Sequence, residues 1–162
     1  MSNFKYGDRS LKHRATLHPD LQVIFDKVLE TRDHSIVAGH RGEAEQNAAF
    51  NSKRSQLRFP ESKHNQMPSM AVDVYPYPLD FIRLNRADEC LNRRQPVDRR
   101  DLDEWRRMDQ FIGYVLATAD QLLTSGQISH RLFSGSDWNG DSILSDQKFH
   151  DLPHFELRVV VP

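Results

Sequence analysis

Apolar positions along the chain recur with two spacings, one typical of helices and one typical of short strands. A stretch that follows "HPD" at 18–20 keeps apolar residues on one helical face, and Pro19 suits a first helical turn. A longer stretch from about Leu102 to Leu123 keeps close to a 3.6-residue period. We therefore predict two helices and expect the second to supply much of the core.

Four short segments predict strands, because they are rich in β-branched residues or alternate between polar and apolar positions. They are "SIVAGHRG", "MAVDVYPY", "HRLFSG" and "HFELRVVV". The last of them places His154, Glu156 and Arg158 on one face. "EAEQNAAFN" predicts a short helix, whereas 52–69 and "SDWNGDSILSD" predict loops.

The stretch 79–101 is rich in charge and shows no clear period, so we interpret it as an inserted surface excursion. The order of the other elements predicts an α+β fold. We expect one small domain over 1–162, with a short, mainly antiparallel sheet and helices packed on one side.

Composition narrows the classes of function. The chain has 162 residues, 38% hydrophobic and 28% charged, which is sufficient for one core. Its net charge is −1, from 22 basic and 23 acidic residues, and this argues against a nucleic-acid partner. Cys90 is the only cysteine, which excludes an intrachain disulfide and a Cys-rich zinc module. No apolar run approaches a membrane span, so we expect no stable membrane association.

Two of the eight histidines have a carboxylate placed to cooperate with them. His64 precedes a strand that contains Asp73, and "DLPHFEL" sets Asp151 three residues before His154. Two histidines and one carboxylate are a recurrent ligand set for catalytic zinc, and a further carboxylate beside the ion then serves as general base. By spacing alone, structural His–Asp pairs are the more common alternative. Four other histidines lie in polar surroundings and are expected at the surface: His13, His18, His34 and His130.

Two motifs resemble those of a known family. "SKHNQMPSMAVD" resembles the SxHxxGxAxD motif, and "DLPHFEL" the D/E-x-x-H motif, of the zinc D-alanyl-D-alanine carboxypeptidases. This family includes VanY-type carboxypeptidases, D-Ala-D-Ala dipeptidases and phage L-alanyl-D-glutamate endolysins. Further similarity lies in "SLKHRATLHPDLQ", "GHRGEAEQ" and "GSDWNGD". The resemblance implies a Hedgehog/DD-peptidase-like fold and a zinc peptidase that acts on the peptidoglycan stem peptide.

Carried over by position, the resemblance implies that His64, Asp73 and His154 bind zinc. It implies that Asp151 is the catalytic base and that Arg41 stabilises the oxyanion or holds a substrate carboxylate. Weaker assignments concern the substrate: Gln46 and Ser62 would orient the peptide, and Trp138 would wall the cleft.

The sequence departs from the family pattern between the first His and the Asp. The interval is nine residues here rather than the usual seven, and the glycine is missing. We interpret this as an enlarged loop. If the loop moved His64 away, His40 or His150 would be the substitute ligand. Glu156 is expected to share a face with His154 and to orient a metal-binding side chain without binding the metal itself.

The loop "DWNGD" also resembles the opening of a calcium site, with Asp137, Asn139 and Asp141 at alternate positions. Ser142 replaces the expected glycine, so we favour a turn over a Ca²⁺ site.

We expect a phage-type endolysin that cuts a stem-peptide bond such as L-alanyl-D-glutamate. A D-alanyl-D-alanine carboxypeptidase is the near alternative, and a non-catalytic, metal-stabilised domain that binds cell wall or protein is the alternative of another class. A metal nuclease is disfavoured by the near-neutral charge. The start, "MSNFKYGDRSLKHR", lacks the apolar core of a secretory signal. We expect a monomer made in the host bacterial cytoplasm that reaches the wall through a separate membrane lesion.

Overall fold

The computed structural model describes residues 3–143, 146–147 and 149–160. Its centre is a four-stranded antiparallel sheet in the order β1-β2-β4-β3, which confirms the predicted α+β class. The strands are β1 (His34–Ala38), β2 (Ala71–Pro76), β3 (His130–Gly135) and β4 (Asp151–Val159). The helices are α1 (Asp8–Arg14), α2 (Pro19–Leu29), α3 (Glu43–Asn51), α4 (Phe81–Asn92) and α5 (Arg99–Thr124), with a 3₁₀ turn η1 (Lys63–Asn65). In the described part of the chain, no helix is both long and apolar enough to cross a membrane.

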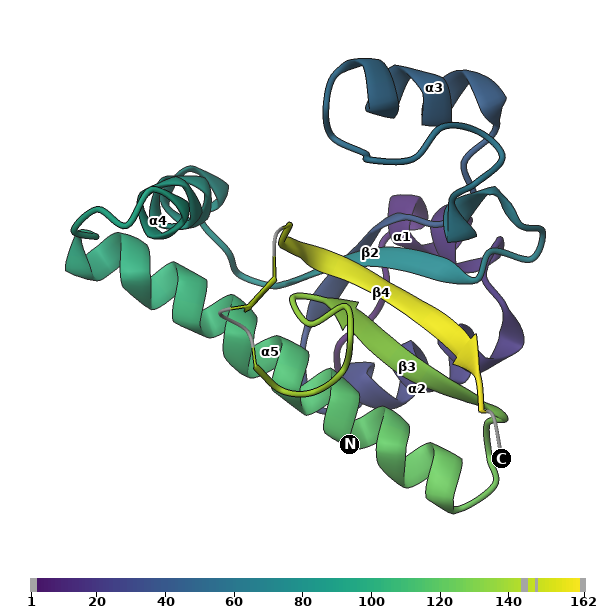
Figure 1. The fold of residues 1–162 in the computed structure, drawn as a ribbon. Coiled ribbons are helices and arrows are strands. Elements are labelled where there is room, and N and C mark those ends of the chain that lie inside the picture. The colour runs from purple at the N-terminus through teal and green to yellow at the C-terminus, as the bar shows by residue number, and fades with distance from the viewer. Residues whose placement is uncertain (1–2, 144–145, 148, 161–162) are drawn as a thin grey trace.

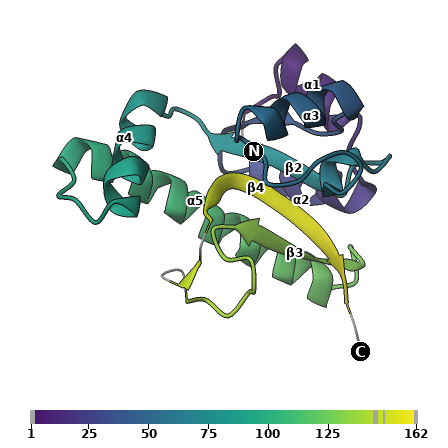
Figure 2. The ribbon, with the colours of Figure 1, turned by 45° about the horizontal axis from the view of Figure 1, so that its top comes forward.

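One face of the sheet packs on α2 and α5, as Figures 1 and 2 show. The apolar stripes predicted for these helices face the sheet, and the core forms between them. Phe25 of α2 meets Phe155 of β4 with ring centroids 5.5 Å apart, and both side chains are fully buried. On β2, Val72 and Val74 point into this core. Asp73, the residue between them, therefore points to the opposite face of the sheet.

The segment 79–101 contains a helix, which differs from the irregular excursion predicted. Asp80 caps α4 by accepting hydrogen bonds from two backbone N–H groups, and Leu84 and Ala87 are buried against α5. Arg83 and Asp101 add an ion pair of 3.1 Å between the two helices. The helical spacing was obscured because α4 buries only a narrow stripe and also carries exposed apolar residues, such as Ile82 and Leu91.

The prediction that His34 lies at the surface is wrong. Its side chain is buried, because Tyr6 and Phe111 from distant parts of the chain cover it. His34 Nδ1 donates to the carbonyl of Arg32 at 2.9 Å, and Nε2 accepts from the Tyr6 hydroxyl at 2.9 Å. This is the neutral form of the ring, and burial lowers the pKa of His34.

Candidate metal centre

Three side chains from separate parts of the chain meet on the sheet face opposite α2 and α5. His64 Nε2 lies 3.2 Å from Asp73 Oδ1 and 3.3 Å from His154 Nδ1, and His154 Nδ1 lies 3.3 Å from Asp73 Oδ1. The exposed fractions of the three residues are 1%, 8% and 7%. The three atoms form a nearly equilateral triangle within a buried cluster.

Strand register brings two of these residues together. Asp73 on β2 and His154 on β4 are direct partners in the antiparallel ladder, so their side chains stand next to each other on one face. His64 comes from η1, which Ser62 caps by accepting a hydrogen bond from the His64 backbone N–H at 3.2 Å. The turn η1 therefore adds His64 to the pair of residues that β2 and β4 hold side by side.

The backbone before Arg41 fixes the orientation of His64. His64 Nδ1 donates to the Gly39 carbonyl at 2.7 Å, and the Arg41 N–H donates to the His64 carbonyl at 2.8 Å. A Cβ at Gly39 would lie 2.4 Å from Thr16 Oγ1 and 2.8 Å from the His13 carbonyl, so no side chain fits there. Since Nδ1 carries the proton, the neutral His64 ring directs the lone pair of Nε2 into the cluster.

Glu156 orients His154 in the corresponding way. Its Oε2 lies 3.3 Å from His154 Nε2, and its Oε1 accepts from Arg158 Nε at 2.8 Å. Burial alone would raise the pKa of Glu156, but hydrogen bonds from His154 and Arg158 lower it to about 2. With the proton of neutral His154 on Nε2, the lone pair of Nδ1 also points into the cluster.

The cluster therefore concentrates acceptors that attract a positive charge. Burial disfavours a charged imidazole, yet hydrogen bonds to Asp73 and Glu156 raise the pKa of His154 to about 9. Burial also opposes ionisation of Asp73, but when the rings are protonated the charge of His64 and hydrogen bonds from both histidines hold the pKa of Asp73 well below the ordinary range. A proton or a cation between these atoms relieves their mutual repulsion.

The triangle has the dimensions of a zinc site. Zinc bonds of about 2.0–2.1 Å in a tetrahedron place ligand atoms about 3.3–3.4 Å apart. The observed edges of 3.2, 3.3 and 3.3 Å match this spacing. Two imidazole nitrogens and one carboxylate oxygen suit Zn²⁺, and three protein ligands leave a fourth position for water or substrate.

Two charged side chains flank the cluster. Arg41 forms an ion pair with Asp73 Oδ2, the oxygen that points away from the triangle. Asp151 stands at the start of β4, opposite Gly135 in the ladder. Burial and the neighbouring Asp73 charge raise the pKa of Asp151 to about 6, while His154 and Arg41 act in the opposite direction. A carboxylate with such a pKa is suited to exchange protons near neutral pH.

The cluster opens into two adjoining cavities. One, of about 320 Å³, is bounded by His64, His154 and Glu156, with Ser62 and Trp138 among its walls. The other, of about 710 Å³, includes Asp73. Both cavities share a common boundary, formed by Arg41, Arg54, Phe149 and Asp151.

Trp138 is a fixed part of the smaller cavity. Its indole N–H donates to the Phe149 carbonyl at 2.7 Å, and its ring lies 5.2 Å from the His154 ring. Arg54 and Phe149 are the two residues at the boundary shared by both cavities that the sequence analysis missed. Phe149 is adjacent to the "HDLPH" motif and was identifiable as a neighbour, whereas nothing in the local sequence of Arg54 distinguishes it from a surface arginine.

Gln46 does not line either cavity, in contrast to the prediction that it orients the peptide. Its side chain is fully buried and donates to Ser55 Oγ at 2.9 Å and to the Leu57 carbonyl at 2.7 Å. The amide therefore supports the loop that forms one wall of the smaller cavity.

The longer interval between His64 and Asp73 leaves His64 in the cluster. The additional length lies at the surface, where Met67 is 68% exposed, and Ser69 then returns the chain by hydrogen bonds with Thr16 and His18. His40 and His150, the substitute ligands considered above, line the larger cavity instead.

The loop with alternating acidic residues is internally hydrogen-bonded. Asp137 accepts from the backbone N–H groups of Gly140 and Ser142 at 2.9 Å, and Asp141 accepts from that of Ile143 at 2.8 Å. Asn139 donates to Asp141 at 3.0 Å. These bonds are those of a turn, the alternative favoured over a calcium site.

The chain resembles a known protein in structure. No family model and no curated protein matches the sequence. Among solved structures, the Serratia marcescens L-Ala D-Glu endopeptidase ChiX matches over 96% of this chain and 92% of its own, with a TM-score of 0.57 and 20% identity. The two chains share a fold. At this identity the similarity concerns architecture alone.

Proposed function

We propose that this chain is a zinc-dependent peptidoglycan peptidase that hydrolyses a stem-peptide bond, with L-alanyl-D-glutamate as the preferred site. The observation that carries the proposal is the triangle of His64 Nε2, Asp73 Oδ1 and His154 Nδ1, which has zinc-site dimensions and lies beside a carboxylate of raised pKa. The shared fold with ChiX, which is described as an L-Ala D-Glu endopeptidase, supports the class of substrate.

His64, Asp73 and His154 would hold the ion, which when bound acidifies water and polarises the carbonyl under attack. Asp151 would accept the proton of the attacking water and return it to the leaving amine. Arg41, held by Asp73, presents a positive charge at the boundary of both cavities, where charge develops on the carbonyl oxygen.

The two adjoining cavities favour an endopeptidase over a carboxypeptidase, and their charge suits an acidic substrate. An internal bond needs room for substrate on both sides, and cavities of about 320 and 710 Å³ meet at Asp151. Arg9, Lys53 and Arg54 line the larger cavity, and no carboxylate among the described residues forms an ion pair with them. These cations suit the free carboxylates that an acidic stem peptide carries beyond the cut bond.

Digestion of purified peptidoglycan, with mass spectrometry of the fragments, tests the proposal. We expect a new amino terminus on the D-glutamyl residue, loss of cleavage with a chelator, and recovery with zinc. Release of terminal D-alanine alone would instead identify a carboxypeptidase. Intact stem peptides at full zinc occupancy would refute the proposed activity and favour a binding domain.

A further inference from the structure

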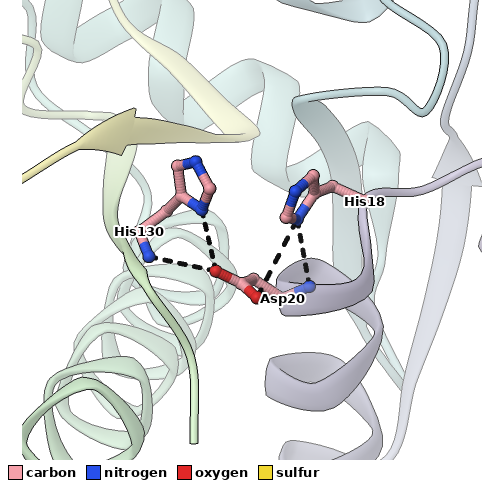
Figure 3. A group of neighbouring side chains, drawn as sticks. All are labelled: His18, Asp20 and His130. Atoms are coloured by element: carbon pink, nitrogen blue, oxygen red, sulfur yellow. Dashed lines mark hydrogen bonds and ion pairs between the residues drawn. The ribbon is translucent and has the colours of Figure 1, made fainter. Parts of the chain in front are cut away.

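A second group of metal-binding residue types lies apart from the candidate metal centre. His18 caps α2, Asp20 lies in its first turn, and His130 begins β3, so the group joins segments about 110 residues apart in the sequence. Figure 3 shows both imidazole rings directed towards the Asp20 carboxylate. One ligand atom from each of the three residues lies within 4.8 Å of the other two.

The two oxygens of Asp20 have different surroundings. Oδ2 accepts from the backbone N–H groups of Ser129 and His130 at 2.9 and 3.0 Å, and it lies 2.9 Å from His130 Nδ1. Among the described residues, none donates a hydrogen bond to Oδ1, whose nearest neighbour in the group is His18 Nδ1 at 4.0 Å. One oxygen therefore anchors the carboxylate, and the other keeps its coordinating capacity.

The imidazoles also retain coordinating capacity. His18 Nδ1 accepts a hydrogen bond from the Asp20 backbone N–H at 3.1 Å, so this nitrogen is unprotonated and carries a lone pair, which becomes available to a metal when that bond opens. His130 Nδ1 faces the carboxylate and carries a proton there, and its Nε2 has no partner among the described residues. The side chains are 22%, 13% and 21% exposed, so an ion from solvent reaches them without entering the core.

We propose that His18, Asp20 and His130 form a second binding site for a divalent metal of the zinc class, which clamps the start of α2 to the start of β3. Two imidazoles and a carboxylate prefer Zn²⁺, Cu²⁺ or Ni²⁺ over the oxygen-preferring Ca²⁺ and Mg²⁺. On binding, the proton of His130 moves from Nδ1 to Nε2, and the Asp20 N–H gives up its bond to His18.

The second site is weaker than the first. Tetrahedral zinc places its ligand atoms about 3.3–3.4 Å apart, so side chains separated by up to 4.8 Å move by as much as about 1.4 Å to close on the ion. The triangle of the metal centre needs no such movement. Zinc therefore fills the metal centre first, and the clamp site fills at higher free zinc.

Zinc counting on the full-length chain without a polyhistidine tag tests the proposal. After dialysis against buffered free zinc, the double variant His18→Asn/His130→Gln should retain one zinc fewer per chain than the wild type. Asparagine is a preferred N-cap, so the variant keeps the start of α2. Ser129→Ala is the matched control, because it alters a neighbour of Asp20 but keeps all three ligands, and it should retain the wild-type number.

The test compares the zinc content of the wild type with that of the double variant, so its result does not depend on whether the candidate metal centre binds zinc. Equal zinc content in the wild type and the double variant at every free zinc concentration would overturn the proposal. A second readout uses the His64→Ala/His154→Ala chain, in which ¹⁵N imidazole signals of His18 and His130 should shift together on zinc addition. Unshifted signals there would also overturn it.

Discussion

The contact between Glu156 and His154 makes a quantitative prediction for metal affinity. The Glu156→Gln variant keeps the shape of the side chain but removes the charge that faces His154 Nε2. Loss of a residue that hydrogen-bonds a metal ligand typically weakens metal affinity 10- to 100-fold, which corresponds to about 1.4–2.8 kcal/mol of binding free energy. The 3.3 Å separation is at the long end for an N–H···O bond, and glutamine keeps an oxygen acceptor. We therefore expect the low end, about a tenfold weaker affinity for zinc.

Competition between the metal-free protein and a chromophoric chelator measures this change. Glu89→Gln is the matched control, because Glu89 pairs with Arg93 on the exposed surface of α4, and its zinc affinity should equal that of the wild type. A Glu156→Gln affinity equal to or above that of the wild type would refute the proposed orienting role of Glu156.

Three further predictions concern the base, the pH dependence and the core. Asp151→Asn should lower the hydrolysis rate by about 10²–10⁴-fold with zinc still bound; comparable hydrolysis would exclude Asp151 as the base. His34 has a lowered pKa in the folded chain, so its contribution to stability is complete above about pH 6.5 and is lost as the pH falls through the folded value. Urea denaturation should thus show a steeper loss of stability between pH 7.5 and 5.5 for the wild type than for His34→Gln, and equal slopes would contradict this. Phe25→Ala should reduce the free energy of unfolding by about 3–5 kcal/mol, whereas Val23→Ala, on the exposed side of α2, should change it by under about 0.5 kcal/mol; similar values in chemical denaturation would contradict the assignment of the core.

Local patterns were sufficient to predict much of the fold. Residues within single segments were sufficient to indicate α2 and α5, which have continuous apolar stripes, as well as the four strands and the short helix α3. The segment of α4 was misinterpreted because its buried stripe is narrow and apolar residues such as Ile82 and Leu91 are exposed outside that stripe, which hides the helical period. A helix that docks on another helix, rather than on the sheet, needs fewer apolar positions and gives a weaker signal.

The environment of single polar residues was less predictable. Motif spacing indicated that His64, Asp73 and His154 belong together, but their convergence depends on the pairing of β2 with β4, which is a long-range property. Gln46 and His34 have polar neighbours in sequence and are nevertheless buried, because segments distant in the chain cover them. A short stretch of sequence around Gln46 or His34 does not contain the residues that cover it in the fold.

Anomalous X-ray scattering at the zinc edge, from crystals of the zinc-loaded chain, tests directly whether His64, Asp73 and His154 bind zinc together. We expect an ion about 2.0–2.1 Å from His64 Nε2 and His154 Nδ1, with Asp73 Oδ1 as the third protein ligand. Fully loaded crystals with no anomalous peak between these three atoms would contradict it.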